Sequence, residues 1–147
     1  MKALALPWLL GIQLATTLPL VGLIWTIQLV HYPLFEKVGE ADFTGYQGAH
    51  MRAIGPLVGP LMLFEMLAVI GLVILEPNPL TILGLLLLIV IWVSTALIQV
   101  PCHRTLTIGF EPQAHRRLVR SNWIRTIAWT MRGLIAILIC PGFALTS

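Results

Sequence analysis

Residues 77–103 read PNPLTILGLLLLIVIWVSTALIQVPCH and contain no formally charged side chain. A helix that crosses a bilayer needs about 20 mostly apolar residues, so this stretch predicts a transmembrane helix over residues 80–100. The two prolines around Asn78 directly before it predict a tight turn. The helix that precedes this turn is therefore expected to be an antiparallel neighbour.

Three further stretches have the same apolar character, at residues 6–30, 57–75 and 123–140. The chain as a whole has 58% hydrophobic residues, 10% charged residues and a mean hydropathy of +0.92, which are values outside the range of soluble domains. We predict an all-α integral membrane protein. Residues 1–147 are expected to form a single domain, a bundle of four transmembrane helices.

The cations predict how the bundle is oriented. The two long connectors and the helix ends beside them carry most of them, whereas Lys2 alone lies on the opposite side. The connector cations are Lys37, Arg52, Arg104, Arg116, Arg117, Arg120 and Arg125. The positive-inside rule then places both connectors in the cytoplasm and both termini outside, in a bacterial inner membrane. The net charge of +3 is interpreted as a topology signal in contact with anionic lipid, with no nucleic-acid role.

The two cytoplasmic connectors, each about 20 residues long, carry helical signals of their own. In the first, Asp42 is expected to cap an amphipathic helix that has Phe43, Tyr46 and His50 on one face. Residues 55–60, GPLVGP, then predict a kink or a short break before the membrane. In the second connector, Pro112 suits a first helical position, so the last helix is expected to begin there.

Two motifs recur in the same order in each half of the chain. Residues 27–33 read IQLVHYP and residues 98–104 read IQVPCHR, and a tryptophan, Trp25 or Trp92, precedes each motif. A tandem duplication of a helical hairpin would give this pattern. A chance match of short motifs with unequal spacing would give it too, and the sequence leaves both interpretations open.

Two charges lie deep in the predicted membrane segments. Glu65 and Arg132 have similar estimated depths, and an isolated charge at such a depth is costly. We therefore expect the two side chains to be in contact. The sequence does not decide between a structural ion pair and a catalytic or proton-transfer site that also uses His103.

The last helix carries a polar stripe, Asn122, Arg125, Trp129 and Arg132, at helical spacing. Gln28 and Gln99 reach the same half of the membrane from other helices. We expect a polar cavity that opens to the cytoplasm, with Glu65 and Arg132 at its floor. The predicted ligand-binding residues are Gln28, Gln99, Asn122, Arg125 and Trp129.

The histidines lie on the predicted cytoplasmic side. Each one alone is typical of an interfacial anchor, but His31, His50 and His103 together with a nearby carboxylate would suit a transition metal, because imidazole is a ligand for Fe, Cu and Zn. Haem is a further cofactor hypothesis, weakened by the position of the histidines at helix ends. No local ligand motif such as HxxxH or HExxH is present.

The segment from Val100-Pro101 to Leu106 and the start of the last helix, Asn122, Trp123 and Arg125, resemble small bacterial four-helix integral membrane proteins, among them the anthrone-oxygenase-like group. This resemblance implies oxidation of an aromatic or lipophilic substrate. It also implies a site that uses Asn122, Arg125 and Trp129.

Three functions follow as hypotheses. The first is a membrane enzyme, such as an oxidoreductase or oxygenase, or a ligand-binding protein that takes a lipophilic molecule from the bilayer. The second is an accessory or assembly subunit of a larger membrane complex, whose polar stripe faces a partner helix. The third is a transporter, which with four helices would need a homo-oligomer to form a pathway.

Overall fold

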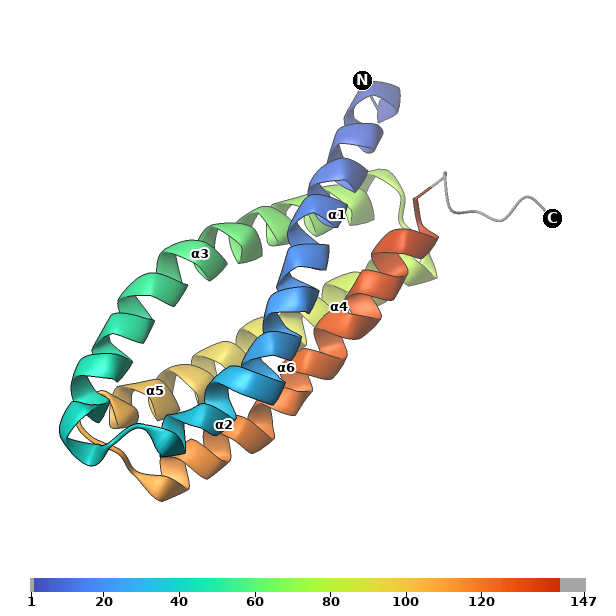
Figure 1. Ribbon diagram of the computed structural model, residues 1–147. Helices are drawn as coiled ribbons and strands as arrows, with labels where there is room; N and C mark the ends of the chain where they lie inside the picture. The colour runs from blue at the N-terminus through green and yellow to red at the C-terminus, as the bar shows by residue number, and fades with distance from the viewer. Residues whose placement is uncertain (1, 141–147) are drawn as a thin grey trace.

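The computed structural model describes residues 2–140, and every regular element in this part of the chain is a helix. Four long helices account for most of the bundle in Figure 1: α1 (Lys2–Thr26), α3 (Glu40–Leu75), α4 (Pro79–Ser94) and α6 (Pro112–Leu138). The shorter elements are the π-helices η1 (Ile27–His31) and η3 (Thr95–Gln99), the α-helices α2 (Tyr32–Leu34) and α5 (Val100–Leu106), and the 3₁₀-helix η2 (Phe35–Lys37). The all-helical class predicted from the sequence is confirmed.

Three of the helical runs are long and apolar enough to cross a membrane, judged by length and composition. They are Lys2–Lys37, Glu40–Leu75 and Pro79–Leu106. Helix α6 is not in this group, and its arginines lie in both halves: Arg116, Arg117, Arg120, Arg125 and Arg132. The structure therefore supports a membrane protein with three candidate spans.

The helices pack in the cyclic order α1, α3, α4 and α6, since each contacts the next and α6 contacts α1. Figure 1 shows the N-terminus and the turn between α3 and α4 at one end of the bundle, with the other two connections at the opposite end. Gly71 of α3 admits Leu9 of α1, because a Cβ atom on Gly71 would lie 2.9 Å from Leu9 Cδ1. Such small residues allow membrane helices to approach closely.

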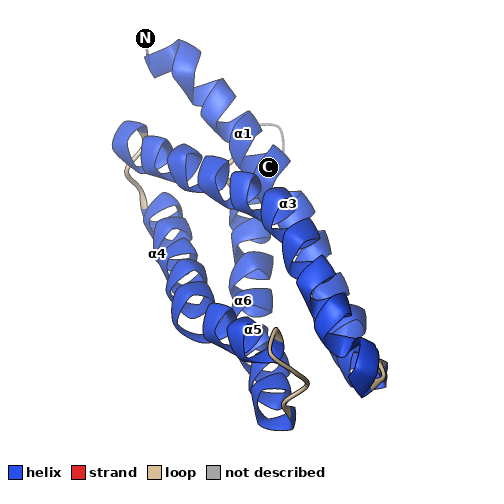
Figure 2. Cartoon of the chain, turned by 90° about the vertical axis from the view of Figure 1, so that its left-hand side faces the viewer, coloured by secondary structure: helices blue, strands red, loops and turns tan. Residues whose placement is uncertain are grey.

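Helix α3 combines the predicted connector helix and the predicted second span in one element of 36 residues. It continues through Pro56 and Pro60, and its ribbon bends along its length in Figures 1 and 2 without a break. The expectation that Asp42 caps this helix was wrong. Gly39 is the N-cap, and Asp42 lies in the first turn, where a negative charge complements the helix dipole.

The start of α6 was predicted correctly. Pro112 is the first helical residue, and the side chain of the N-cap residue Glu111 accepts hydrogen bonds from the backbone N–H groups of Gln113 and Ala114. Proline suits this position because the backbone N–H it lacks would have no partner inside the helix. This start lets α6 extend beyond the predicted segment 123–140.

Both repeated motifs adopt the same unusual backbone. The π-helices η1 and η3 contain Gln28 and Gln99, and the α-helix that follows each has a proline in its first turn, Pro33 or Pro101. A π-helix inserts one extra residue into an α-helix and often occurs at functional sites. The insertion changes which face of the helix the following residues occupy.

The buried apolar side chains form two clusters. One joins the four long helices and contains Leu20, Ile24, Met62, Val69, Leu88, Ile91, Ala128 and Trp129. The other lies at the connector end and contains Ile27, Tyr32, Phe35, Phe43, Cys102, Leu106 and Leu118. Phe35 is fully buried in the second cluster, where its ring contacts Phe43, Tyr46 and His50 edge-on. The predicted connector face of Phe43, Tyr46 and His50 thus packs against the protein.

Candidate functional site

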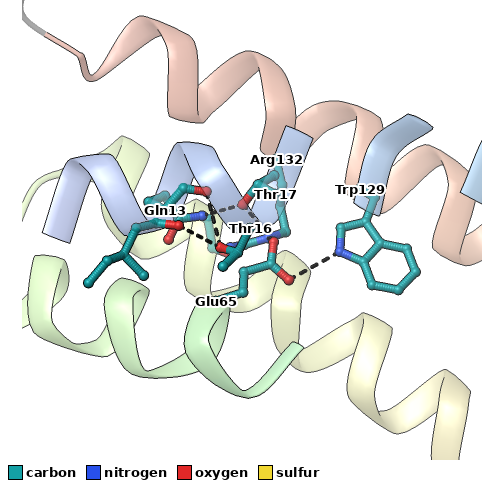
Figure 3. A network of polar contacts seen from close by, with 8 residues as sticks. Gln13, Thr16, Thr17, Glu65, Trp129 and Arg132 are labelled. Carbon is teal, nitrogen blue, oxygen red and sulfur yellow. Dashed lines mark hydrogen bonds and ion pairs between the residues drawn. The ribbon is translucent and has the colours of Figure 1, made fainter. Parts of the chain in front are cut away.

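A buried ion pair lies in the middle of the bundle (Figure 3). Arg132 donates from Nε to Oε1 of Glu65 at 3.0 Å, and the side chains have relative exposures of 1% and 0%. The predicted contact between these two residues is confirmed. Because the pair joins α6 to α3, its attraction holds two helices that are far apart in the sequence.

Three further groups form hydrogen bonds with this pair. Thr17 donates to Oε1 of Glu65 at 2.7 Å, and the indole N–H of Trp129 donates to Oε2 at 3.2 Å. Arg132 also donates from Nη1 to the backbone carbonyl of Gly84. The Glu65 carboxylate therefore receives donors from α1 and α6, and the guanidinium reaches α4, so the network ties all four long helices together. Interhelical hydrogen bonds of this kind help to associate helices in a membrane. The hydrophobic effect does not drive that association, because lipid tails are as apolar as the helix surfaces.

A separate pocket of about 240 Å³ lies between α3 and the run α4–η3–α5. It is slightly smaller than the roughly 300–1,000 Å³ of typical small-molecule sites, which favours a small ligand. The residues that line it are Ile27, Tyr32, His50, Met51, Ile54, Gly55, Val58, Gly59, Met62, Trp92, Thr95, Gln99, Val100, His103 and Arg125.

The pocket is amphipathic. Most of its lining is aliphatic, sulfur-containing or aromatic, and its polar groups come from Tyr32, His50, Thr95, Gln99, His103 and Arg125. An apolar cavity with a few convergent polar groups is the usual form of a small-molecule site. This pocket is the candidate functional site of the described chain.

The predicted position of the ion pair relative to the cavity was wrong. Glu65 and Arg132 do not line the pocket, whereas Arg125 does. Trp129 lies between them, because its N–H bonds Glu65 while the Arg125 guanidinium lies 5.1 Å from its ring centroid. Arg125 and Arg132 are seven positions apart on the same helix, but the Trp129 ring isolates the Arg132 pair from the pocket.

Arg125 is the unpaired charge of this region. Its side chain is buried with 6% exposure, and its Nε makes no hydrogen bond. Within the described residues, no carboxylate forms an ion pair with it, since the three ion pairs present involve other cations. Its partners are the ring of Trp129 and the side chain of Tyr32. A buried guanidinium without an anion is costly, so this residue needs a counter-charge from elsewhere.

Both ring nitrogens of His103 form hydrogen bonds with other side chains. Its Nε2 lies 2.9 Å from the hydroxyl of Tyr32, and its Nδ1 lies 2.8 Å from Nε2 of Gln47. An amide nitrogen only donates, so Nδ1 of His103 accepts and Nε2 carries the hydrogen. The predicted proton-transfer residue therefore lines the pocket with both ring nitrogens already bonded to the protein.

Only one of the two ring nitrogens of His50 forms a hydrogen bond with the described residues. Its Nδ1 lies 2.9 Å from Nε2 of His31, and its own Nε2 makes no hydrogen bond among the described residues. A hydrogen bond between two imidazole nitrogens needs one donor and one acceptor, so at least one of these rings is neutral. Because His50 lines the pocket and His31 does not, His31 orients the ring and His50 is the better-placed acceptor for a proton from a ligand.

The three predicted metal ligands come together without forming a metal site. The rings of His50 and His103 have centroids 5.6 Å apart, and His31 is bonded to His50. In residues 2–140, no group of three or more His, Cys, Asp or Glu side chains has a geometry that could hold a metal ion. The metal and haem hypotheses stay predictions without support from this arrangement.

The remaining predicted ligand-binding residues have different neighbours. Asn122 donates to Oε1 of Gln28 at 2.9 Å, and Gln28 donates to the carbonyl of Val119 at 3.2 Å. These residues therefore connect η1 to α6 and lie outside the pocket lining. Gln99 lines the pocket and also connects helices, because its Nε2 donates to Ser121 at 3.0 Å.

Several site residues were not among those predicted from the sequence. Tyr32 and Gln47 position His103, and Gly55 and Gly59 open the wall of the pocket on α3. The glycines were assigned to a kink, although their spacing of four residues places them on one helix face. That spacing was the signal available for finding them.

Comparison of the chain with protein-family models, with curated proteins and with solved structures finds no match. The resemblance to the anthrone-oxygenase-like group therefore stays a prediction.

Proposed function

We propose that this chain is a membrane-embedded binding protein for a small lipophilic molecule, which occupies the pocket between α3 and α4–η3–α5. The observation that carries the proposal is the apolar pocket with Arg125, His50 and Gln99 among its lining residues. Gly55 and Gly59 of its α3 wall are exposed, and a Cβ atom on either would meet nothing within 4 Å. An opening on this side would admit a ligand directly from the hydrocarbon phase.

The proposal includes α6 as a fourth membrane span. Exposed apolar side chains follow one face of α6 at helical spacing: Ile124, Ile127, Met131, Leu134 and Leu138. Arg125 and Arg132 lie on the buried face instead. A helix with its charges turned inward and its apolar face outward suits a lipid environment, although its average composition is polar.

The proposed orientation has both termini outside and the two connectors in the cytoplasm of a bacterial inner membrane. Support comes from the arginines at the connector end, since Arg116, Arg117 and Arg120 line a surface groove of α6. Cations of this kind remain on the cytoplasmic side and attract anionic lipid headgroups. Membrane lipid is accordingly a proposed partner.

An enzymatic version of the proposal assigns proton transfer to the pocket. Arg125 would stabilise an oxyanion of the ligand, and His50, oriented by His31, would accept the ligand's proton. The resemblance to the anthrone-oxygenase-like group would make that ligand an aromatic substrate of an oxidation. In this version Glu65 and Arg132 stabilise the bundle and do not touch the ligand.

The binding proposal is tested with Gly59→Leu and its matched control Gly45→Leu. Both glycines are exposed residues of α3 with no atom within 4 Å of an added Cβ, but only Gly59 lines the pocket. Calorimetric titration of 2-naphthol into the protein in lipid nanodiscs, corrected with empty nanodiscs, should give a saturable signal. We expect Gly59→Leu to remove this signal and Gly45→Leu to retain it. Equal binding by both variants would overturn the proposal.

The alternative function is an accessory subunit of a larger membrane complex or a homo-oligomer. The observation that favours it is the exposed pair Gly55 and Gly59, because small residues four positions apart often form the contact between membrane helices. A stoichiometric partner or second copy that co-purifies in mild detergent, and is lost on Gly59→Leu, would favour this function.

A further inference from the structure

We propose that the ligand of this pocket is an amphiphilic acid whose oxyanion pairs with Arg125. This inference rests on the proposed binding function and specifies the chemical class of the ligand. The observation behind it is a charge imbalance inside the protein.

The imbalance follows from the ion pairs. Glu65 is the buried carboxylate of the bundle, and Arg132 already neutralises it at 3.0 Å. Arg125 is buried to a similar degree but has no carboxylate partner in the described part of the chain. Among residues 2–140, the interior therefore contains two guanidinium groups and one carboxylate, which leaves one positive charge uncompensated beside the pocket.

The neighbours of Arg125 favour an anion and do not replace one. The Trp129 ring face, 5.1 Å from the guanidinium, attracts a cation only weakly. Tyr32 and Gln99 add neutral polar groups, and His31 and His50 share a hydrogen bond that keeps at least one of them neutral. An oxyanion at this end of the pocket would neutralise the positive charge of Arg125. It would also accept charge-assisted hydrogen bonds, which are stronger than those that a neutral ligand accepts.

The rest of the pocket defines the other half of the ligand. Met51, Ile54, Val58, Met62 and Trp92 form an apolar lining that would exclude a strongly hydrated inorganic anion. A small acid with an acyl chain or an aromatic ring satisfies both halves. Its carboxylate or phenolate would lie against Arg125, and its apolar part would lie between α3 and α4.

The test compares decanoate with decanol, which has the same chain length and no charge. Each is titrated calorimetrically into the protein in phosphatidylcholine nanodiscs, with empty nanodiscs as the blank. We expect decanoate to bind at least about ten-fold more tightly than decanol, since the difference is a buried charge pair. Arg125→Gln should remove this preference, and Arg125→Lys, which keeps the charge, should retain part of it. The control Arg104→Gln removes an exposed arginine outside the pocket and should change nothing.

The outcomes separate this inference from the binding function itself. If decanol binds as tightly as decanoate and Gly59→Leu abolishes both, the pocket binds lipophiles but the inferred acid is wrong. If neither ligand responds to Gly59→Leu, both proposals fail. A chloride titration that displaces nothing supports an amphiphilic acid, whereas competition by chloride at equal concentration would identify a site for inorganic anions and overturn the inference. The comparison of decanoate with decanol on the unmodified protein decides the question even if Arg125→Gln does not fold.

Discussion

Arg132 of α6 donates to Glu65 of α3 over 3.0 Å, and both side chains are almost completely removed from solvent and lipid. Thr17, Trp129 and the carbonyl of Gly84 form further hydrogen bonds with the pair, whereas Nη2 of Arg132 has no partner among the described residues. A buried pair with this many partners is costly to disrupt, because each removed group leaves several others unsatisfied.

Single replacements at the pair should therefore destabilise the protein strongly. Glu65→Gln replaces one carboxylate oxygen with a nitrogen that only donates, so the side chain can no longer offer separate acceptor oxygens to Thr17 and Trp129, and it leaves the charge of Arg132 unpaired. We expect Glu65→Gln or Arg132→Gln alone to reduce the free energy of unfolding by about 3 to 5 kcal/mol, and the double replacement to recover much of this loss. Reversible unfolding in detergent micelles measures all three values.

The exposed pair Lys2 and Glu76 provides the control for this cycle. Their side chains lie 3.1 Å apart with relative exposures of 59% and 44%. Glu76→Gln should change the unfolding free energy by at most about 1 kcal/mol, as is typical of surface ion pairs. Equal effects at the buried and exposed pairs would contradict the central role given to Glu65 and Arg132.

Thr17→Val tests the link between α1 and the pair. Valine has a similar shape but lacks the hydroxyl that donates to Glu65 at 2.7 Å and accepts from Gln13 at 2.7 Å. Hydrogen bonds to charged groups contribute about 1.5 to 3 kcal/mol, so we expect a loss of this size. In the control Thr26→Val, the lost bond is to the Gly22 carbonyl on an exposed part of the same helix, and the change should stay within about 0.5 kcal/mol.

The start of α6 should depend on pH through Glu111. Backbone hydrogen bonds from Gln113 and Ala114, with a smaller contribution from Arg116, lower the pKa of Glu111 below its usual value. A lowered pKa in the folded state means that the cap stabilises the helix above the pKa of the unfolded chain and loses this effect as the pH falls through the folded pKa. The protection factor of the Ala114 amide, which is its exchange rate relative to the unfolded chain at the same pH, should fall over that acidic range, and Glu111→Gln should make this factor insensitive to pH.

The orientation is tested with two introduced cysteines in a Cys140→Ser background. Pro77→Cys lies in the exposed turn between α3 and α4, and Ile108→Cys lies in the loop between α5 and α6 with 85% exposure. An impermeant thiol reagent should label the first in intact cells and the second only after lysis. If instead Ile108→Cys is labelled in intact cells and Pro77→Cys only after lysis, the proposed orientation is wrong and the connector-end arginines lie outside.

The sequence correctly predicted features that depend on local composition or on depth in the membrane. The all-helical class follows from uninterrupted apolar runs, and the start of α6 follows from Pro112, whose ring suits a first helical turn. The contact between Glu65 and Arg132 was predictable because each is a deep charge that needs a partner and their depths agree.

The position of the pocket was decided only by the tertiary structure. Helical periodicity shows that Arg125, Trp129 and Arg132 share a face, but it does not show which neighbouring helix each one meets. The rotation of α3 and α6 about their axes places Trp129 against Glu65 and leaves Arg125 beside the pocket. Arg125 and Arg132 therefore have different environments, although they lie on the same face of α6.

The histidine arrangement also depends on contacts between distant segments. His31 follows Gln28 within the π-helix η1, whose extra residue shifts the positions of the side chains relative to an ordinary α-helix. His50 reaches His31 from α3, and His103 reaches Tyr32 from α5. The sequence by itself determined that this chain forms apolar helices with a few buried charges, because hydropathy and helix periodicity are local properties. Only the tertiary structure decided which charge is paired and which faces the pocket, because that depends on the phase and packing of helices that are far apart in the chain.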